Sequence, residues 1–257
     1  MRLSHWYGRL GNNIQQCAIG TMVAQQSGGT FKQELDHDII EKYETTFGSS
    51  DEEQVSKFFY WEGPYREVNL SSGFITRSIS QVCKEFVFPH LRVPRVSVPD
   101  DTIVIHIRSG DVFDKGVANP DQYVPNPLDF YRQLLDSFDK ALVVTEPDEY
   151  NPVVQELKKH SKVTVQSLTV QEDFATMLGA KHLASSGVGT FAISAALCSQ
   201  NIENFYCSDV SISEHLNYHM LVGTDVKVHV MDLNNYIKPG EWRNTDEQRQ
   251  FILDYKT

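Results

Sequence analysis

The sequence lacks a long hydrophobic run. No stretch approaches the roughly 18 apolar residues of a membrane-spanning helix, and the opening residues MRLSHW lack the apolar core of a signal peptide. As it stands, the sequence therefore predicts a cytoplasmic protein with no membrane segment. Arg2 already begins a predicted strand, so a second interpretation is a domain of a longer polypeptide. A lumenal location would then fit if a membrane anchor has been removed.

Positive charge and cysteine are also scarce. Lysine and arginine number 23 against 34 aspartate and glutamate, which gives a formal net charge of -11. Because such a field repels polyanions, we expect no nucleic-acid partner, although a local arginine cluster can still bind phosphate. The cysteines have no CxxC or other metal-ligand spacing and lie in apolar contexts. They predict reduced core thiols at Cys17, Cys83, Cys198 and Cys207.

The character of the sequence pattern changes near residue 98. Residues 94–101 contain two prolines and a polar end, which is typical of a linker, and predict domains of residues 1–98 and 99–257. The first domain is irregular. We predict a strand over residues 3–6 and a helix over residues 13–26, and residues 28–65 permit no clear assignment.

Short β-branched runs alternate with helical periodicity in the second predicted domain. This alternation predicts an α/β fold with a parallel sheet, because parallel strands need a crossover connection of about a dozen residues. Ligands of such sheets bind outside the carboxyl ends of the strands. We predict strands at residues 102–108, 141–145, 162–167, 182–185, 204–208 and 226–231, and helices beginning near residues 127, 152, 171 and 190.

The first of these strands ends in a cation. Residues 101–111 read DTIVIHIRSGD, with isoleucines on one face and Val104, His106 and Arg108 on the other. An arginine at the carboxyl edge of a buried strand can present a planar five-donor fork to a diphosphate. Structural roles stay open, namely an Arg108 ion pair with Asp111 or another carboxylate and a core histidine at His106.

Two glycine-containing turns also lie between a predicted strand and a predicted helix. Residues 185–190 read SSGVGT, and such a turn exposes the first free N–H groups of the following helix to an anion. A plain tight turn with Thr190 near the N-cap explains the same residues. Residues 8–13 read GRLGNN, where glycines let the backbone approach a ligand closely.

These three segments, in this order, resemble the superfamily of α1,2-, α1,6- and protein O-fucosyltransferases. GRLGNN at residues 8–13 is similar to the motif G-x-x-G-N-Q, and HIRSGD at residues 106–111 is similar to H-x-R-R-x-D. TEPD at residues 145–148 sits where the family has a strand ending in S-D. Residues 173–191 resemble the last motif, D-x-x-x-M-x-x-C-K-H followed by S-T-F-S. Residues 31–98 match little.

The resemblance implies a GT-B architecture, in which two Rossmann-like domains face a cleft, with the acceptor on the first and the donor on the second. It implies an inverting, metal-independent glycosyltransferase without a cofactor. The donor would be a GDP-sugar, usually GDP-fucose. A deoxyhexose, with L-fucose as the first candidate, would pass to a hydroxyl of a glycan or glycoconjugate acceptor.

The resemblance also implies roles for residues. Arg108 would contact the β-phosphate and the bridging oxygen, and Asn12 would approach the same region across the cleft. Asp111, in the same motif as Arg108, is the third catalytic candidate. Guanine would meet His106 and Asp173, because its N1–H and amine suit a carboxylate. The other donor-binding residues implied are Gly11, Phe174, Gly189, Thr190 and Phe191.

Departures from the family pattern keep other hypotheses open. Ser109 replaces the second arginine, and residues 189–194 read GTFAIS, so the sugar and the linkage do not follow. A catalytically inactive nucleotide-sugar-binding module is one alternative. Another is a metal-dependent glycosyltransferase using Asp36-His37-Asp38, whose carboxylate spacing suits a divalent cation, although a solvated acidic turn is favoured there. The catalytic base stays open among Glu34, Asp36, Asp38 and Asp111.

Overall fold

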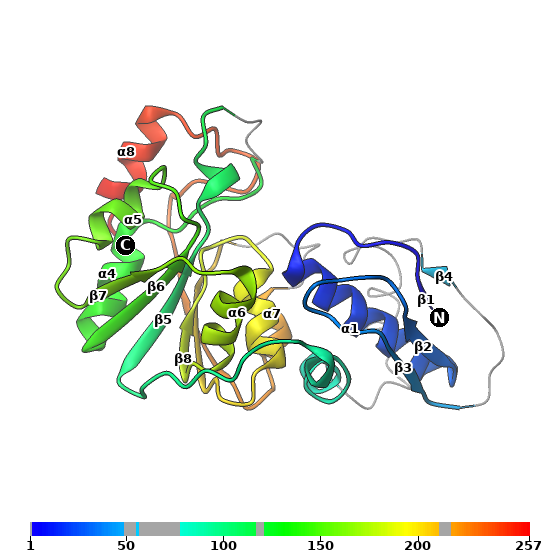
Figure 1. Cartoon of the computed structure of the whole chain (residues 1–257). Coiled ribbons are helices and arrows are strands. Elements are labelled where there is room, and N and C mark those ends of the chain that lie inside the picture. The colour runs from blue at the N-terminus through cyan, green and yellow to red at the C-terminus, as the bar shows by residue number, and fades with distance from the viewer. Residues whose placement is uncertain (1, 49–54, 57–77, 117–120, 211–216) are drawn as a thin grey trace.

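A six-stranded parallel sheet lies at the centre of the larger part of the molecule (Figure 1). The computed structural model describes residues 2–48, 55–56, 78–116, 121–210 and 217–257. The strands are β5 (Thr102–Ile107), β6 (Lys140–Thr145), β7 (Val163–Gln166), β8 (His182–Ala184), β9 (Asn204–Ser208) and β10 (Lys227–Met231). All six predicted strands are confirmed, and no end differs from the prediction by more than one residue. The α/β class is therefore confirmed.

The order of the strands identifies the ligand edge of this sheet. The order β10-β9-β8-β5-β6-β7, with every neighbouring pair parallel, is the 3-2-1-4-5-6 order of a Rossmann-like sheet. The chain leaves β5 towards β6 on one side and returns to β8 on the other. Sheets of this order bind ligands in a crevice outside the carboxyl ends of the two strands at the switch point, which here are β5 and β8.

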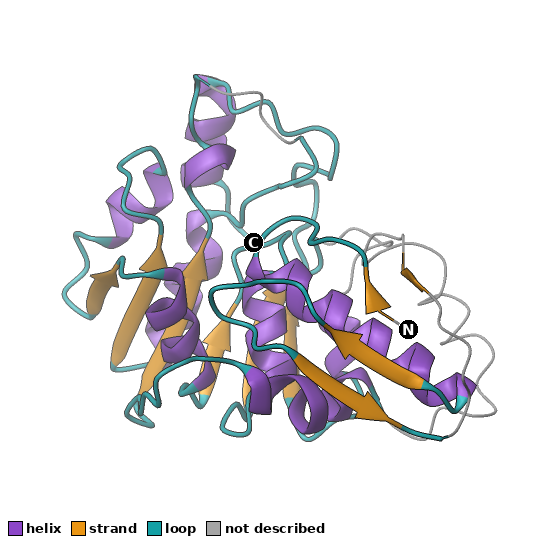
Figure 2. Cartoon of the chain, turned by 45° about the vertical axis from the view of Figure 1, so that its right-hand side comes forward, coloured by secondary structure: helices purple, strands orange, loops and turns teal. Residues whose placement is uncertain are grey.

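Helices cover both faces of the sheet, as Figure 2 shows. The isoleucines of β5 face one hydrophobic cluster, with α4 (Leu128–Ser137), α5 (Pro152–Leu157) and α8 (Asp246–Asp254). Val104 faces the other cluster, with α6 (Val170–Leu178) and α7 (Phe191–Cys198). The predicted alternation along β5 is thus confirmed. The four predicted helix starts are also confirmed, each within one residue.

A smaller sheet lies near the N-terminus. Its strands are β1 (Arg2–Leu3), β2 (Thr30–Gln33), β3 (Tyr43–Thr46) and β4 (Val55–Ser56), in the order β3-β2-β1-β4. Only β2 and β3 are antiparallel. The predicted strand over residues 3–6 is wrong beyond Leu3, because the backbone of His5 and Tyr7 bonds instead to the buried side chains of Asn13 and Gln16.

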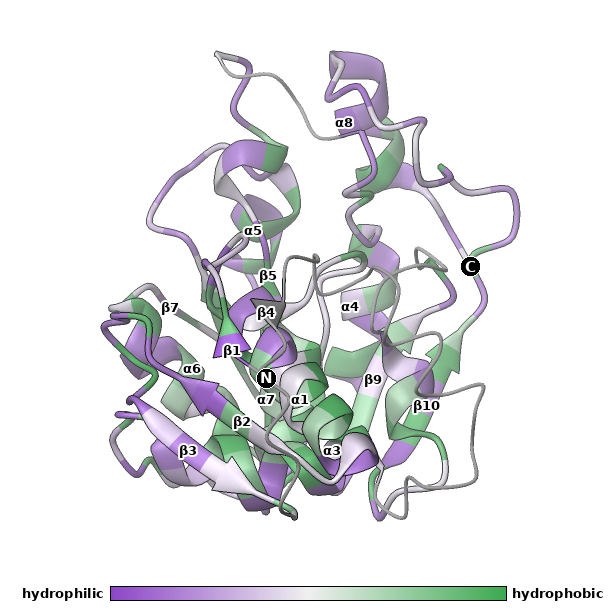
Figure 3. Ribbon diagram, turned by 90° about the vertical axis from the view of Figure 1, so that its right-hand side faces the viewer, coloured by the Kyte–Doolittle hydropathy of each residue, from purple (hydrophilic) through white to green (hydrophobic). Residues whose placement is uncertain are grey.

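Helix α1 (Leu10–Ser27) joins the two sheets. It begins three residues before the predicted helix and ends at Gly28, whose left-handed φ of 64° closes the last turn. Residues of α1 and α7 belong to one hydrophobic cluster, together with α3 (Ile79–Val82) and the π-helical turn that follows it. Figure 3 shows the hydrophobic residues along α1 and α3. One continuous core therefore runs from the small sheet to the large one.

Residues 92–99, where the domain boundary is predicted, have no regular secondary structure. All four cysteines are buried free thiols, as predicted. Within the ranges that the structure describes, no helix is both long and apolar enough to cross a membrane.

Candidate functional site

The predicted site segments meet at the switch point of the large sheet. Arg108 follows the last residue of β5, and the turn of residues 185–190 follows β8. The N-terminus of α1 packs against this turn. Thr190 donates a hydrogen bond from its Oγ1 to Asn12 Oδ1 at 2.5 Å, and Ser194 Oγ donates to the carbonyl of Gly11 at 2.9 Å. Segments about 180 residues apart in sequence thus pack side by side at the switch point.

Gly11 allows this close packing. A Cβ at position 11 would lie 2.7 Å from the backbone carbonyl of Thr190, which is closer than real side chains approach. Only glycine fits there without a shift of α1 or of the turn. The predicted N-cap position of Thr190 is confirmed, although its side chain bonds to Asn12 instead of capping α7.

The Arg108 guanidinium bonds a carboxylate along one edge and stacks on an aromatic ring with one face. Its Nε and Nη2 donate to the two carboxylate oxygens of Asp111 at 3.1 and 2.7 Å, and its guanidinium stacks 3.9 Å above the centre of the Tyr123 ring. Burial opposes both charges. The paired hydrogen bonds outweigh it, raising the pKa of Arg108 and, with help from Arg9, lowering the pKa of Asp111. The ion pair that the sequence left open is therefore present.

The ion pair with Asp111 uses only some of the N–H donors of Arg108. A guanidinium carries five N–H groups, and the contact with Asp111 uses the Nε–H and one N–H of Nη2. The arginine side chain is 18% exposed, so its outer edge reaches the surface of the crevice. Asp111 and Tyr123 hold the plane of the guanidinium, which leaves N–H groups of the fork for a ligand.

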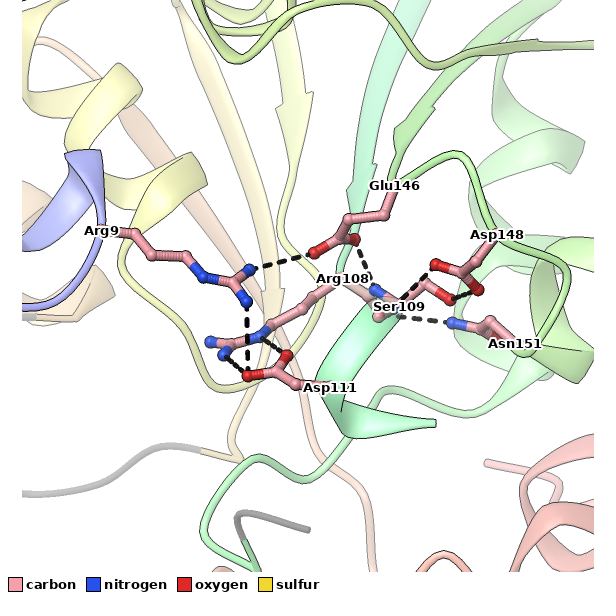
Figure 4. Close-up of polar contacts among 8 residues, drawn as sticks. Arg9, Arg108, Ser109, Asp111, Glu146, Asp148 and Asn151 are labelled. Carbon is pink, nitrogen blue, oxygen red and sulfur yellow. Dashed lines mark hydrogen bonds and ion pairs between the residues drawn. The ribbon is translucent and has the colours of Figure 1, made fainter. Parts of the chain in front are cut away.

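The loop after β6 holds the turn that carries Arg108 (Figure 4). Glu146 accepts a hydrogen bond from the Ser109 backbone N–H at 2.6 Å. Asp148 accepts from the Ser109 hydroxyl at 2.6 Å and from the Gly110 N–H at 2.9 Å. Asn151 donates to the carbonyl of Arg108 at 3.2 Å. Three side chains of one loop therefore fix the backbone from the Arg108 carbonyl to the Gly110 N–H.

Arg9, at the N-terminus of α1, contacts two of the same carboxylates, those of Asp111 and Glu146. Its Nη2 lies 3.5 Å from Asp111 Oδ2, and its Nη1 lies 3.4 Å from Glu146 Oε1 (Figure 4). The cluster thus combines two arginines with Asp111, Glu146 and Asp148. Two of the three carboxylates, those of Glu146 and Asp148, accept backbone N–H groups, so part of their hydrogen-bonding capacity is used within the chain.

His106 lies deep beneath this cluster. Burial, followed by the charge of Arg108, lowers the pKa of His106 to about 3, so the imidazole is neutral at physiological pH. Its ring contacts Phe191 at 5.2 Å, and Phe191 contacts Phe174 at 5.3 Å. Within the described residues its Nδ1 is buried without a hydrogen-bond partner. The structure therefore brings three predicted donor-binding residues together, and a polar atom remains to be satisfied.

Asp173 is buried at the N-terminus of α6. Its carboxylate accepts hydrogen bonds from Gln166 Nε2 at 2.8 Å and from the Leu168 N–H at 3.2 Å. Burial nevertheless raises its pKa. The carboxylate closes the β7–α6 loop, and four acceptor positions leave room for one more donor.

Gly189 lies in the turn after β8, where an added Cβ would meet only Ser186 Oγ, at 3.9 Å.

The acidic motif of residues 36–38 lies beside the first turn of α1, where His37 Nε2 is 3.2 Å from Asn13 Oδ1. Asp36 pairs with Lys42 at 2.7 Å, and His37 accepts hydrogen bonds from the backbone of Ile39 and Ile40 at 2.9 and 3.1 Å. These contacts describe an exposed turn. In the part of the chain that the structure describes, no three His, Cys, Asp or Glu side chains form a group that could hold a metal ion. Glu34 and Asp38 are exposed.

The sequence patterns did not identify four members of this cluster, Arg9, Tyr123, Glu146 and Asp148. Arg9 lies inside the quoted GRLGNN motif, and the two acids lie inside the quoted TEPD segment, so the motifs contained the signal. Their mutual contacts depend on tertiary structure and have no sequence pattern. Comparison with known proteins adds nothing to this geometry: no family model, no curated protein and no solved structure matches the chain.

Proposed function

We propose that this protein binds the diphosphate of a nucleotide-sugar donor at Arg108 and transfers the sugar to a hydroxyl of a glycan acceptor. The observation that carries the proposal is the position of Arg108. It lies at the switch point of a Rossmann-like sheet, where nucleotide phosphates bind in such folds. Its guanidinium is held by Asp111 and Tyr123, so binding a diphosphate would require little reordering of the side chain.

Helix geometry supports the same ligand. The N-termini of α1 and α7 meet at the site, and among the described residues neither has a side-chain cap. Free N–H groups and the positive ends of two helix dipoles favour an anion there. Asn12 and Thr190, which bond to each other, mark the point where these helix ends meet. The finer expectation, a GT-B enzyme for a GDP-linked deoxyhexose, rests on the resemblance of the motifs.

The reaction we propose breaks the bond between the sugar C1 and the diphosphate oxygen. The acceptor hydroxyl attacks C1 and loses its proton to a base, and the bonding electrons leave with the nucleoside diphosphate. Arg108 would neutralise the charge that develops on the leaving oxygen. Losing such a contact typically lowers the rate by on the order of 100- to 1000-fold. The neutral, buried His106 would help to hold the nucleobase and would not act as the base.

Calorimetry with GDP, UDP and ADP, each with and without EDTA, tests the proposal when it is paired with a donor-hydrolysis assay. We expect Arg108→Ala to abolish transfer and Arg108→Lys to restore little, because lysine keeps the charge but loses the fork. Arg132→Ala, on the exposed face of α4, is the matched control. Nucleotide binding without transfer or hydrolysis would instead identify an inactive binding module. Loss of activity in EDTA would point to the metal-dependent alternative.

A further inference from the structure

Two arginines from distant segments converge on one carboxylate oxygen. Asp111 Oδ2 lies 2.7 Å from Arg108 Nη2 and 3.5 Å from Arg9 Nη2. Arg9 also approaches Glu146 Oε1 at 3.4 Å through its Nη1. Figure 4 shows Arg9 extending from α1 towards the turn after β5, so that its guanidinium lies next to that of Arg108 and both face the Asp111 carboxylate.

Stability does not explain the position of Arg9. Its side chain is 66% exposed, and exposed ion pairs contribute only about 0–1 kcal/mol. Arg9 is also the N-cap residue of an 18-residue helix, where a cation meets the positive end of the helix dipole. A neutral or acidic residue would stabilise that helix end better. The side chain is therefore better explained by what it faces in the crevice.

The arrangement matches the recognition of an oxyanion. Guanidinium groups bind carboxylate and phosphate oxygens with the same fork, and a pair of them around one oxygen suits a group with several oxygens and a charge of two or more. The Asp111 carboxylate supplies one such oxygen from within the chain. In chemical terms Asp111 Oδ2 stands in for a phosphate oxygen.

We propose that Arg9 is a second phosphate-binding residue, and that a phosphate oxygen of the ligand takes the place of Asp111 Oδ2 between Arg9 and Arg108. Asp111 and Glu146 hold the arginine pair in position while the site is empty of ligand. The identity of the anion as a nucleotide diphosphate rests on the proposed function. The role of Arg9 in binding the anion rests on the contacts alone.

Titration of the full chain with inorganic pyrophosphate, followed by calorimetry at about 0.15 M salt, tests this proposal. We expect Arg9→Gln to weaken binding about 10- to 100-fold, which corresponds to the loss of a hydrogen bond between charged groups. Asp111→Asn keeps an acceptor for Arg108 Nε but removes the competing charge, so we expect binding to tighten at least about fivefold. Arg9→Lys keeps the charge and should lose less than Arg9→Gln.

Two variants serve as matched controls. Arg92→Gln removes an exposed arginine that pairs with Glu41 at 3.1 Å, and Asp101→Asn removes a carboxylate that pairs with Lys140 at 2.8 Å. Asp101 precedes β5 and so lies at the opposite end of that strand from Arg108. Both variants should bind pyrophosphate like the wild type. Circular dichroism and thermal unfolding of every variant establish that the fold is intact.

The outcomes separate this inference from the proposed function. If Arg9→Gln binds pyrophosphate like the wild type while Arg108→Gln loses binding, the role of Arg9 is refuted and the proposed function stands. Weaker binding by Asp111→Asn would refute the exchange of carboxylate for phosphate. If Arg108→Gln keeps wild-type affinity, or if the wild-type chain binds no pyrophosphate, both proposals fail.

Discussion

The hydrogen bond between Ser109 and Asp148 should make a measurable contribution to stability. Ser109 is only 1% exposed, and its hydroxyl donates to Asp148 Oδ1 at 2.6 Å. A buried hydrogen bond to a charged group contributes about 1.5–3 kcal/mol. Alanine at position 109 removes this bond alone. Alanine at position 148 also leaves the backbone N–H groups of Gly110 and Tyr150 without their acceptor, so it should destabilise the protein more.

A double-mutant cycle isolates this bond from the other contacts of Asp148. Urea unfolding of the wild type, Ser109→Ala, Asp148→Ala and the double variant should give a coupling energy of about 1.5–3 kcal/mol. The exposed pair Lys115 and Asp246 provides the control cycle and should give a much smaller coupling. Coupling of the Ser109 pair no larger than that of the control would refute the view that the loop after β6 holds the Arg108 turn.

Three other predictions concern the neighbourhood of the site. Gly11→Ala should lower the urea midpoint of unfolding. Overpacking against Thr190 costs about 1–3 kcal/mol and outweighs the gain of about 1 kcal/mol from better helix propensity. An unchanged midpoint would contradict the close packing of α1. His106 binds a proton more readily unfolded than folded, so its contribution to stability is complete above about pH 6.5 and is lost as the pH falls towards 3. Between pH 7 and pH 5 the wild type should lose about 2 kcal/mol more than His106→Gln, as measured by urea unfolding at both pH values. Ellman's reagent should label all four cysteines in denaturant and none rapidly in the native protein. All four are buried, and burial raises the pKa of Cys17 and Cys207 to about 12. Rapid labelling of the native protein would refute this burial.

The large sheet could be predicted from the sequence because its strands satisfy local rules. Five of the six strands contain β-branched or aromatic residues, and two of the helices begin at a recognisable cap, namely Asn151 before Pro152 and the capping box of Thr169 and Glu172. The small sheet could not be predicted. Two of its strands have only two residues, and β2 and β3 read TFKQ and YETT. Their pairing depends on tertiary contacts, such as the packing of Phe31 against Gly20 of α1.

The candidate site was predictable in part for similar reasons. Arg108 follows a buried strand, and the rule that ligands bind at carboxyl strand ends applies to any parallel sheet. The contact of Arg9 with Glu146 joins residues 137 positions apart, and no local pattern encodes it. The need for glycine at position 11 is likewise visible only once the backbone of Thr190 lies beside it. Motifs therefore indicated which segments carry the site, and the fold determined which side chains meet.

Transfer from a panel of GDP-, UDP- and dTDP-sugars, with GDP-fucose included, tests the central claim most directly when it is measured for the wild type and Arg108→Ala side by side. We predict that the wild type consumes a GDP-sugar and releases GDP, and that Arg108→Ala loses at least about 100-fold in rate with its fold intact. Wild-type turnover by Arg108→Ala, or no binding of any nucleotide sugar by the wild type, would contradict it.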